Sequence, residues 1–200
     1  MAGTISGSTI TGSEIASSNA TLSNITFGSN LSTTGGLNLS GTIGLANGIT
    51  LNKGISSDWY AAPGTQLTTG GTAVINSSGG NIIAGNGGPG TFGIGSGVTL
   101  QGYGTLTTNS SATLNNQGTI RASTAGQVFS IKPTTLNNTG TIATTLGSIG
   151  IFPTNPFSNA GVLEIGPNTS ISAKSFHQCG GRHHPRRFRS GAGEPLTPRR

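Results

Sequence analysis

The chain has 200 residues, of which 7% are charged and 5% are aromatic, whereas about 25% of the residues of an average soluble domain are charged. Glycine accounts for 35 residues, and the formal net charge is +6. No segment reaches the roughly 18 apolar residues of a membrane-spanning helix, and none shows a sustained apolar period of about 3.6 residues. Short runs of Ile, Val and Thr are separated instead by Gly and Asn, which form turns. The sequence therefore predicts an all-β protein without a direct membrane span.

The N-terminal segment, residues 1–29, has an apolar residue at every fifth position. These residues are Ile5, Ile10, Ile15, Ala20 and Ile25. A five-residue period is typical of a four-sided β-solenoid, and in this respect the segment resembles pentapeptide-repeat proteins. The alternative is a set of irregular coils that belong to one continuous solenoid. We expect pentapeptide-like or irregular N-terminal coils, and the sequence leaves both open.

Two segments in the middle of the chain stand out. NKGISSDWYAAPGTQ, residues 52–66, contains the only Trp and the only Asp, and we expect a loop or local insertion in which Trp59 and Tyr60 cover an edge of the core. GNGGPG, residues 85–90, satisfies the G-x-G-x-x-G pattern of dinucleotide-binding sites. That pattern needs a helix directly after it and an acidic residue about 20 positions on. Neither follows, so we interpret this segment as a turn.

One phrase is repeated in the C-terminal half of the chain. TLNNQGTIRAST at residues 113–124 is followed by TLNNTGTIATTL at 135–146 and, more loosely, by FSNAGVLEIGPN at 157–168. The glycines of these phrases, Gly118, Gly140 and Gly161, recur at nearly equal intervals. A fixed period in the twenties is typical of a solenoid in which each period forms one coil. The sequence therefore predicts a parallel β-solenoid with about 21–22 residues per coil over residues 30–176.

Equivalent residues of successive coils should stack at the strand spacing of about 4.8 Å. Ile120, Ile142 and Leu163 then form one inward ladder. A polar ladder is expected at a corner of the coil, where amide side chains bond to their copies above and below. Its members are Asn115 and Asn116, Asn137 and Asn138, and Ser158 and Asn159. The glycine of each phrase is expected to supply a backbone angle that a β-carbon would penalise.

The repeated LNNxGTI phrases, in a background rich in Gly, Ser, Thr and Asn and poor in charge, resemble the passenger regions of bacterial autotransporter adhesins. They are also similar to filamentous-haemagglutinin-type surface proteins. The resemblance covers residues 30–176 and rests on the amino-acid composition and the period of the repeat. It implies a right-handed parallel β-helix that is secreted or exposed at the cell surface. Residues 1–20 lack the basic and apolar regions of a signal peptide, and the translocating outer-membrane domain of that family is missing, so we interpret the chain as a fragment.

The composition changes abruptly at His177. Residues 177–200 contain all three His, the only Cys and six of the seven Arg, so Lys+Arg minus Asp+Glu is 6 − 1 = +5 there and 4 − 3 = +1 in residues 1–176. Three interpretations are open: a shifted reading frame, a basic arm that binds nucleic acid or anionic lipid through phosphate contacts, or a metal site at His177, Cys179, His183 and His184. Zinc usually takes four well-spaced ligands, which these residues do not supply. We favour a disordered, frame-shifted tail with no metal and no specific nucleic acid.

Parallel β-helices also include polysaccharide lyases and hydrolases, which need paired carboxylates or acidic residues clustered on calcium. The only acidic residues before residue 177 are Glu14, Asp58 and Glu164, far apart in sequence. Lys53 and Asp58 are close in sequence, and we interpret them as a solvated pair in a loop. No His precedes residue 177 to serve a Ser or Cys nucleophile. We therefore predict no enzymatic activity and no catalytic, cofactor-binding or metal-binding residue.

These features predict a structural or adhesive β-helical segment that presents a face rich in Thr, Ser and Asn. The expected partners are host or matrix carbohydrate or protein, bound through hydroxyl and amide groups, or further copies of the chain joined at the open solenoid ends. The expected location is extracellular or at the bacterial cell surface. A pure spacer, a β-helical carbohydrate-active enzyme fragment and a phage-tail-fibre-like piece remain as alternatives.

Overall fold

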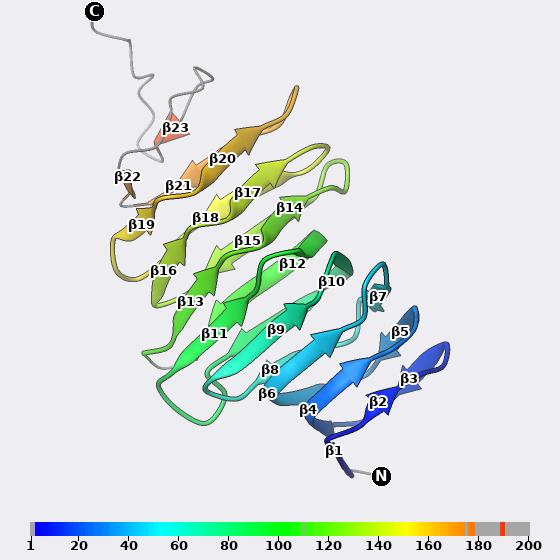
Figure 1. Ribbon diagram of the computed structural model, residues 1–200. Coiled ribbons are helices and arrows are strands. Elements are labelled where there is room, and N and C mark those ends of the chain that lie inside the picture. Colours follow the sequence, from blue (N-terminus) through cyan, green and yellow to red (C-terminus); the bar gives the residue numbers. More distant parts are fainter. Residues whose placement is uncertain (1–2, 110, 175, 179–188, 191–200) are drawn as a thin grey trace, which may run out of the picture.

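The computed structural model describes residues 3–109, 111–174, 176–178 and 189–190. Within these ranges every regular element is a β-strand, and the strands of successive coils pair in parallel. The described chain forms a β-solenoid of about 7 turns, with β1 at one end of the stack and β21 near the other (Figure 1). The prediction of an all-β parallel solenoid is confirmed.

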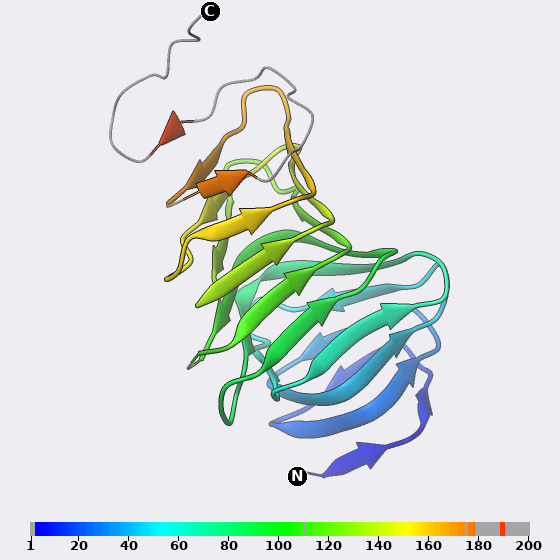
Figure 2. The ribbon, with the colours of Figure 1, turned by 60° about the vertical axis from the view of Figure 1, so that its left-hand side comes forward.

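The strands stack into three parallel sheets, which we call faces A, B and C and which the chain visits in that order (Figure 2). Face A contains β2 (Thr9–Ile10), β9 (Thr65–Thr69), β11 (Thr91–Ile94), β13 (Thr113–Asn116), β16 (Thr135–Asn138), β19 (Phe157–Asn159) and β22 (Phe176–Gln178). Face B contains β3 (Glu14–Ala16), β5 (Leu31–Thr34), β7 (Thr50–Lys53), β14 (Thr119–Ala122), β17 (Thr141–Thr144) and β20 (Val162–Ile165). Face C contains β1 (Thr4–Ser6), β8 (Trp59–Ala61), β15 (Val128–Lys132), β18 (Ser148–Ile151), β21 (Ile171–Ala173) and β23 (Arg189–Ser190).

Four longer strands turn a corner of the coil and belong to two faces. β4 (Ala20–Phe27) and β6 (Leu37–Leu45) pass from face C to face A, and β10 (Ala73–Ala84) and β12 (Val98–Thr108) pass from face B to face C. The pairing shifts register at the corner of β4, where Asn24 has a φ of 49°, and at the corner of β10, where Gly79 and Gly80 have φ values of 111° and 66°. Asn and Gly tolerate this left-handed region better than other residues.

Inward side chains stack into apolar columns that run along the solenoid axis. On face B the column is Leu31, Leu51, Ile75, Leu100, Ile120, Ile142 and Leu163, each in register with the next. On face C it is Leu37, Trp59, Ile82, Leu106, Ile131 and Ile151. Ile120 and Ile142 are fully buried, and the predicted inward ladder of these two residues with Leu163 is confirmed.

The prediction of a loop or local insertion at residues 52–66 is wrong. The segment contains the end of β7, all of β8 and the start of β9. Trp59 is in register with Leu37 below it and Ile82 above it, and only 2% of its surface is exposed. The indole therefore fills the centre of face C instead of covering an edge of the core. The unusual composition of this segment does not make it a loop, because Trp59 belongs to the inward apolar column of face C.

The five-residue period of the N-terminus has a simple origin in the three-sided coil. Ile5, Ile10 and Ile15 lie one each on β1, β2 and β3, which belong to faces C, A and B. Ile5 is in register with Leu22, and Ile10 with Phe27. Each short side of the first coil thus contributes one isoleucine, and residues 3–27 stack on the same three faces as the later coils.

Coil length varies along the solenoid. Thr4 pairs with Thr21 and Thr65 with Phe92, so the first coil is much shorter than the coil that begins at β9. The predicted 21–22 residues hold where the LNN phrase repeats, because 22 residues separate Asn116 from Asn138 and 21 separate Asn138 from Asn159. Except at the β4 and β10 corners, the paired strands keep their register, so the turns between faces absorb most of the difference in length.

The glycines of the repeated phrase serve a different purpose from the one expected. None of Gly118, Gly140 and Gly161 has a positive φ. A β-carbon at Gly118 would lie 2.6 Å from the Gly95 carbonyl oxygen, and one at Gly140 or Gly161 would collide with the backbone of the preceding coil in the same way. These positions need glycine because the coils approach each other closely at this corner, and backbone angle plays no part.

The GNGGPG segment forms a turn, as predicted. Gly85, Gly87 and Gly88 all have positive φ, and the Gly88 N–H donates to the Gly85 carbonyl at 3.1 Å. The strand β11 begins at Thr91 directly afterwards. No helix follows whose N-terminus could meet a pyrophosphate, so the dinucleotide-binding interpretation has no structural support within this part of the described chain.

Candidate functional site

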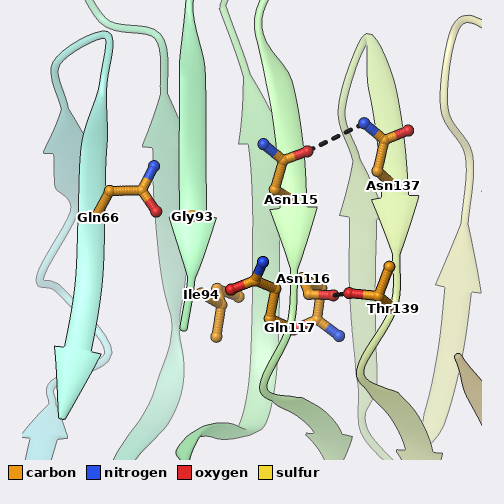
Figure 3. A pocket seen from close by; sticks show the side chains of 8 residues that line it. All are labelled: Gln66, Gly93, Ile94, Asn115, Asn116, Gln117, Asn137 and Thr139. Atoms are coloured by element: carbon orange, nitrogen blue, oxygen red, sulfur yellow. Dashed lines mark hydrogen bonds between the residues drawn. The ribbon is translucent and has the colours of Figure 1, made fainter. Parts of the chain in front are cut away.

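Face A carries an outward row of amide side chains. Gln66, Gly93, Asn115 and Asn137 occupy equivalent positions of β9, β11, β13 and β16. Their backbones therefore follow each other at the strand spacing of about 4.8 Å. The side chain of Asn137 donates from Nδ2 to Oδ1 of Asn115 at 3.0 Å (Figure 3). This pair is the outward half of the predicted polar ladder.

Gly93 interrupts this row and leaves a recess. A β-carbon at Gly93 would lie 2.5 Å from Cδ and 2.8 Å from Nε2 of Gln66, so the Gln66 side chain lies over the glycine. The recess has a volume of about 150 Å³. Its lining consists of Gln66, Gly93, Ile94, Asn115, Asn116, Gln117, Asn137 and Thr139 (Figure 3). Five of these eight residues bear a primary amide, and none bears a charge.

A second amide ladder is buried beneath the first, on the inward side of the same strands. Asn116 donates from Nδ2 to Oδ1 of Asn138, and Asn138 donates in the same way to Asn159, both at 2.6 Å. All three residues are at most 1% exposed. Stacked amides that bond to their copies were predicted, and the structure confirms them. It also divides them into two ladders, one on each side of the sheet.

The buried ladder replaces an apolar column. In the earlier coils the same inward position is held by Ile25, Ile43, Leu67 and Ile94. Each ladder Nδ2 points toward the next coil, so each Oδ1 faces the preceding one, and Oδ1 of Asn116 faces the coil of Ile94. Ile94 has no donor to offer, and Oδ1 of Asn116 has no hydrogen-bond partner. A buried carbonyl without a partner costs about 1–3 kcal/mol.

The chemistry that the recess offers is that of neutral hydrogen bonding. Each primary amide supplies two N–H donors and one carbonyl acceptor, and Thr139 adds a hydroxyl group. Such groups pair with hydroxyl or amide groups of a ligand and have little long-range attraction for charged molecules. Asn115 and Asn137 repeat at the strand spacing, and Gln66 lies on the other side of Gly93, so a ligand with regularly spaced polar groups meets amide partners along this part of face A.

Lys53 forms a second unusual feature, at the corner between faces B and C. It stands in an inward column with Thr33 and Ser77, and it is fully buried. Its Nζ donates to the Gly79 carbonyl at 2.6 Å, and the Ser77 hydroxyl donates to the same oxygen at 3.2 Å. Burial lowers the pKa of Lys53 to about 8, although the nearby Asp58 acts to raise it. The expectation of a solvated Lys53–Asp58 contact in a loop is therefore wrong.

The surroundings of Lys53 explain how an amine is accommodated in the core. Trp59 donates from Nε1 to the Thr33 hydroxyl at 3.3 Å, and that hydroxyl lies 3.4 Å from the hydroxyl of Ser57. Asp58 accepts from the backbone N–H of Asn81 at 2.7 Å and so holds the chain just after the β10 corner. The polar groups satisfy one another and the backbone carbonyl of the corner, which is a structural role.

The three acidic side chains considered for catalysis lie apart. Glu14 is on β3 in the first coil and Glu164 is on β20 near the other end, whereas Asp58 precedes β8. No group of three or more His, Cys, Asp or Glu side chains comes together within the described residues. Of the metal candidates in the tail, Cys179, His183 and His184 lie outside the described residues, and the backbone of His177 belongs to β22. Among the described residues no helix is long and apolar enough to span a membrane.

Sequence reasoning missed the recess and the burial of Lys53. For Lys53 a signal was present: Leu51, Asn52 and Lys53 alternate, and in a strand the residue two positions from a buried Leu faces the same side. For the recess, the signal is that Gly93 is in register with Gln66 and Asn115. This register can be found in the sequence only if Phe92 is aligned with Leu114 of the next coil. That alignment depends on the strand register and not on any repeated phrase.

The fold and the recess define a three-sided parallel β-solenoid with a neutral, amide-lined outer face. Comparison with known proteins found no matching family model, no similar curated sequence and no similar solved structure.

Proposed function

We propose that this chain is a non-catalytic structural and adhesive segment of a secreted or surface-exposed bacterial protein, and that the outer side of face A binds neutral polar ligands. The observation that carries the proposal is the recess over Gly93, where the amides of Gln66, Asn115, Gln117 and Asn137 from three coils meet on one uncharged outer surface. A stacked solenoid holds these groups at fixed spacing, so binding does not have to order them first. The resemblance to adhesin passenger regions supports the location.

A neutral glycan suits this surface better than a charged ligand. Sugar hydroxyls both donate and accept, as amides do, whereas the recess has no charged side chain to pair with a phosphate or carboxylate. Single hydrogen bonds of this kind contribute only about 0.5–1.5 kcal/mol each. Useful affinity must therefore come from several coils or from many copies of the chain that bind at once.

The proposal is tested by binding of the full chain to an array of neutral oligosaccharides. In the double variant Gln66→Leu/Asn115→Leu, both amides that flank Gly93 are lost, and we expect at least a tenfold loss of the array signal. The matched control is Asn52→Leu, which removes an outward amide on face B and should bind like the wild type. Equal binding by the double variant, or no neutral glycan bound by the wild type, would reject an adhesive role for this face.

A further inference from the structure

Face C carries an exposed aromatic side chain between two lysines. Ile131, Ile151 and Ala173 are in register in β15, β18 and β21, and Lys132, Phe152 and Lys174 follow them directly. The Phe152 N–H donates to the Ile131 carbonyl at 2.8 Å, and the Lys174 N–H donates to the Ile151 carbonyl at 2.9 Å. The three side chains therefore begin from adjacent coils, with the lysine backbones about 9.6 Å apart, twice the strand spacing.

Phe152 lies back over the strand instead of pointing away from it. A β-carbon at Gly150 would lie 3.0 Å from Cζ and 3.3 Å from Cδ2 of Phe152, so the ring occupies the space above this glycine. Phe152 is nevertheless 45% exposed. Any larger residue at position 150 would push the ring off the sheet. Gly150 thus leaves room for the Phe152 ring on the outer side of face C, and we call this exposed aromatic side chain the platform.

Among the described residues, the charge on the strands that carry the platform is positive, with no acidic side chain on them. The chain has three lysines, of which Lys53 is buried in the core and the other two, Lys132 and Lys174, are the exposed ones beside Phe152. The acidic side chains of the described chain are Glu14, Asp58 and Glu164, and none of them lies on β15, β18 or β21. Both ammonium groups are therefore available to an anionic partner.

Hydroxyl groups surround the platform on the same face. Ser130 and Ser172 are in register with Gly150 on either side of it. Ser170 donates from its hydroxyl to that of Ser148 at 3.2 Å. The surface thus combines an apolar ring face, two cations and a set of small donors and acceptors within three adjacent coils.

We propose that Lys132, Phe152 and Lys174 form a binding site for an acidic polysaccharide, a chain of sugars that carry carboxylate or sulfate groups. The face of an aromatic ring is apolar with a negative quadrupole, and the C–H groups of one side of a pyranose ring match it. The lysines on both sides pair with anionic groups of the neighbouring sugars. The site uses another face, other residues and another ligand class than the amide recess, so it does not depend on the neutral-glycan proposal.

Nucleic acid is the competing occupant for an aromatic ring among cations. Tight nucleic-acid binding draws on about 6–10 phosphate contacts, and its aromatic side chains stack successive bases. Among the side chains that the structure describes, this site offers two cations and one ring, with serine hydroxyls around them. The small number of charges and the hydroxyl surroundings favour a sugar chain, and single-stranded DNA serves as the comparison ligand in the test.

The test measures binding of the full chain to polygalacturonate and dextran sulfate, with neutral dextran and single-stranded DNA as comparisons. We expect at least a tenfold loss of affinity for both acidic polymers in Lys132→Gln/Lys174→Gln and at least a fivefold loss in Phe152→Ala. The matched control Arg121→Gln removes a cation from face B and should have no such effect. Six of the seven arginines follow residue 176 in every variant, so their nonspecific contribution is common to all.

A fluorescent variant separates this site from nonspecific attraction. Phe152→Trp places an indole on the platform, whereas the native Trp59 is buried, and its emission should shift to the blue when polygalacturonate binds. The proposal is overturned if Phe152→Ala binds acidic polymers like the wild type, or if Arg121→Gln loses as much affinity as the double lysine variant. Single-stranded DNA bound more tightly than polygalacturonate through the same residues would also overturn it. Unchanged melting temperatures confirm that the variants are folded.

Discussion

Lys53 shows how a charged side chain is kept inside a solenoid with hardly any other charge. Its amine reaches a backbone carbonyl at a corner where β10 changes face and the ladder shifts register. Taking an ammonium group out of water is unfavourable, and the lowered pKa of about 8 expresses that cost. Lys53 therefore has two opposing effects. Its amine donates to the Gly79 carbonyl, but burial makes its charged form less favourable than it is in water.

The lowered pKa of Lys53 predicts a specific dependence of stability on pH. Between about pH 8, the pKa in the folded chain, and 10.5, its ordinary value, the unfolded state binds more protons, so the free energy of unfolding rises with pH. Below pH 8 both states are protonated, and Lys53 contributes no pH dependence. We expect a rise of about 1–2 kcal/mol after allowance for solvent screening, measured by urea unfolding at a series of pH values.

Lys53→Met is the variant that checks this assignment. It keeps the length of the side chain and removes the amine, so the rise between pH 8 and 10.5 should disappear. The Gly79 carbonyl keeps the Ser77 hydroxyl, so stability at pH 7 should change by less than about 1 kcal/mol. Lys132→Met, at an exposed position, should retain the rise. A rise that persists unchanged in Lys53→Met would place its cause elsewhere.

The glycine of the repeated phrase is the second residue whose role can be measured alone. In Gly140→Ala the new methyl group would lie 2.6 Å from the carbonyl carbon of Gln117, and this contact is with backbone that cannot rotate away. We expect a loss of about 1–3 kcal/mol, typical of overpacking. Gly70→Ala is the control, because a β-carbon there meets nothing within 4 Å. Equal urea midpoints for the two variants would contradict the close-approach explanation.

At the scale of the strand, the buried asparagine ladder links β13, β16 and β19. Asn138 is the central member of this ladder. Its side chain accepts a hydrogen bond from Asn116 and donates one to Asn159. In Asn138→Leu the Asn159 Oδ1 loses its donor within the core, and we expect a loss of about 2–4 kcal/mol, because a buried polar group is left without a partner. Asn137→Leu is the matched outward substitution at an exposed position and should cost less than about 0.5 kcal/mol. Chemical denaturation of both variants shows whether the buried ladder carries the stability that the outer one lacks.

The strands that could be predicted from the sequence are those of the repeated phrase. The regular spacing of its glycines predicts the register of Ile120, Ile142 and Leu163, and the strand pairing confirms it. Earlier coils share the same inward column, but their lengths differ, as the pairs Thr4–Thr21 and Thr65–Phe92 show. Turns can take up extra residues without disturbing the ladders, and for that reason the period fades while the fold continues.

The candidate sites were less accessible to sequence reasoning than the fold. Each depends on which residues meet across coils of unequal length: Gly93 between Gln66 and Asn115, or Phe152 between Lys132 and Lys174. These residues lie a whole coil apart in the sequence, and no common phrase connects them. The burial of Lys53 was also missed. Residues 52–66 are polar and contain an Asp, which is typical of a loop, and the alternation of Leu51, Asn52 and Lys53 along a strand was not considered.

At the scale of the whole molecule, the first coil is paired on one side only among the described residues. β1, β2 and β3 each pair with a strand of the following coils on one side only. Ile5 is 44% exposed, and Ile10 and Ile15 are only partly buried. Unpaired backbone groups beside apolar side chains are a template for another strand. We therefore predict that this chain associates with further copies of itself through its open edge.

Charge placed on that edge should weaken the association. In Ile5→Lys/Ile15→Lys two of the three faces carry a lysine at the end of the stack, and lysine is a residue that protects sheet edges in natural proteins. Sedimentation velocity over a range of concentrations should show at least a tenfold higher dissociation constant than in the wild type. Ser78→Lys, exposed at the β10 corner, adds charge away from the edge and should associate like the wild type. Association that is equally strong in all three proteins would mean that the copies meet through their sides, where the amide recess and the Phe152 platform would then be covered.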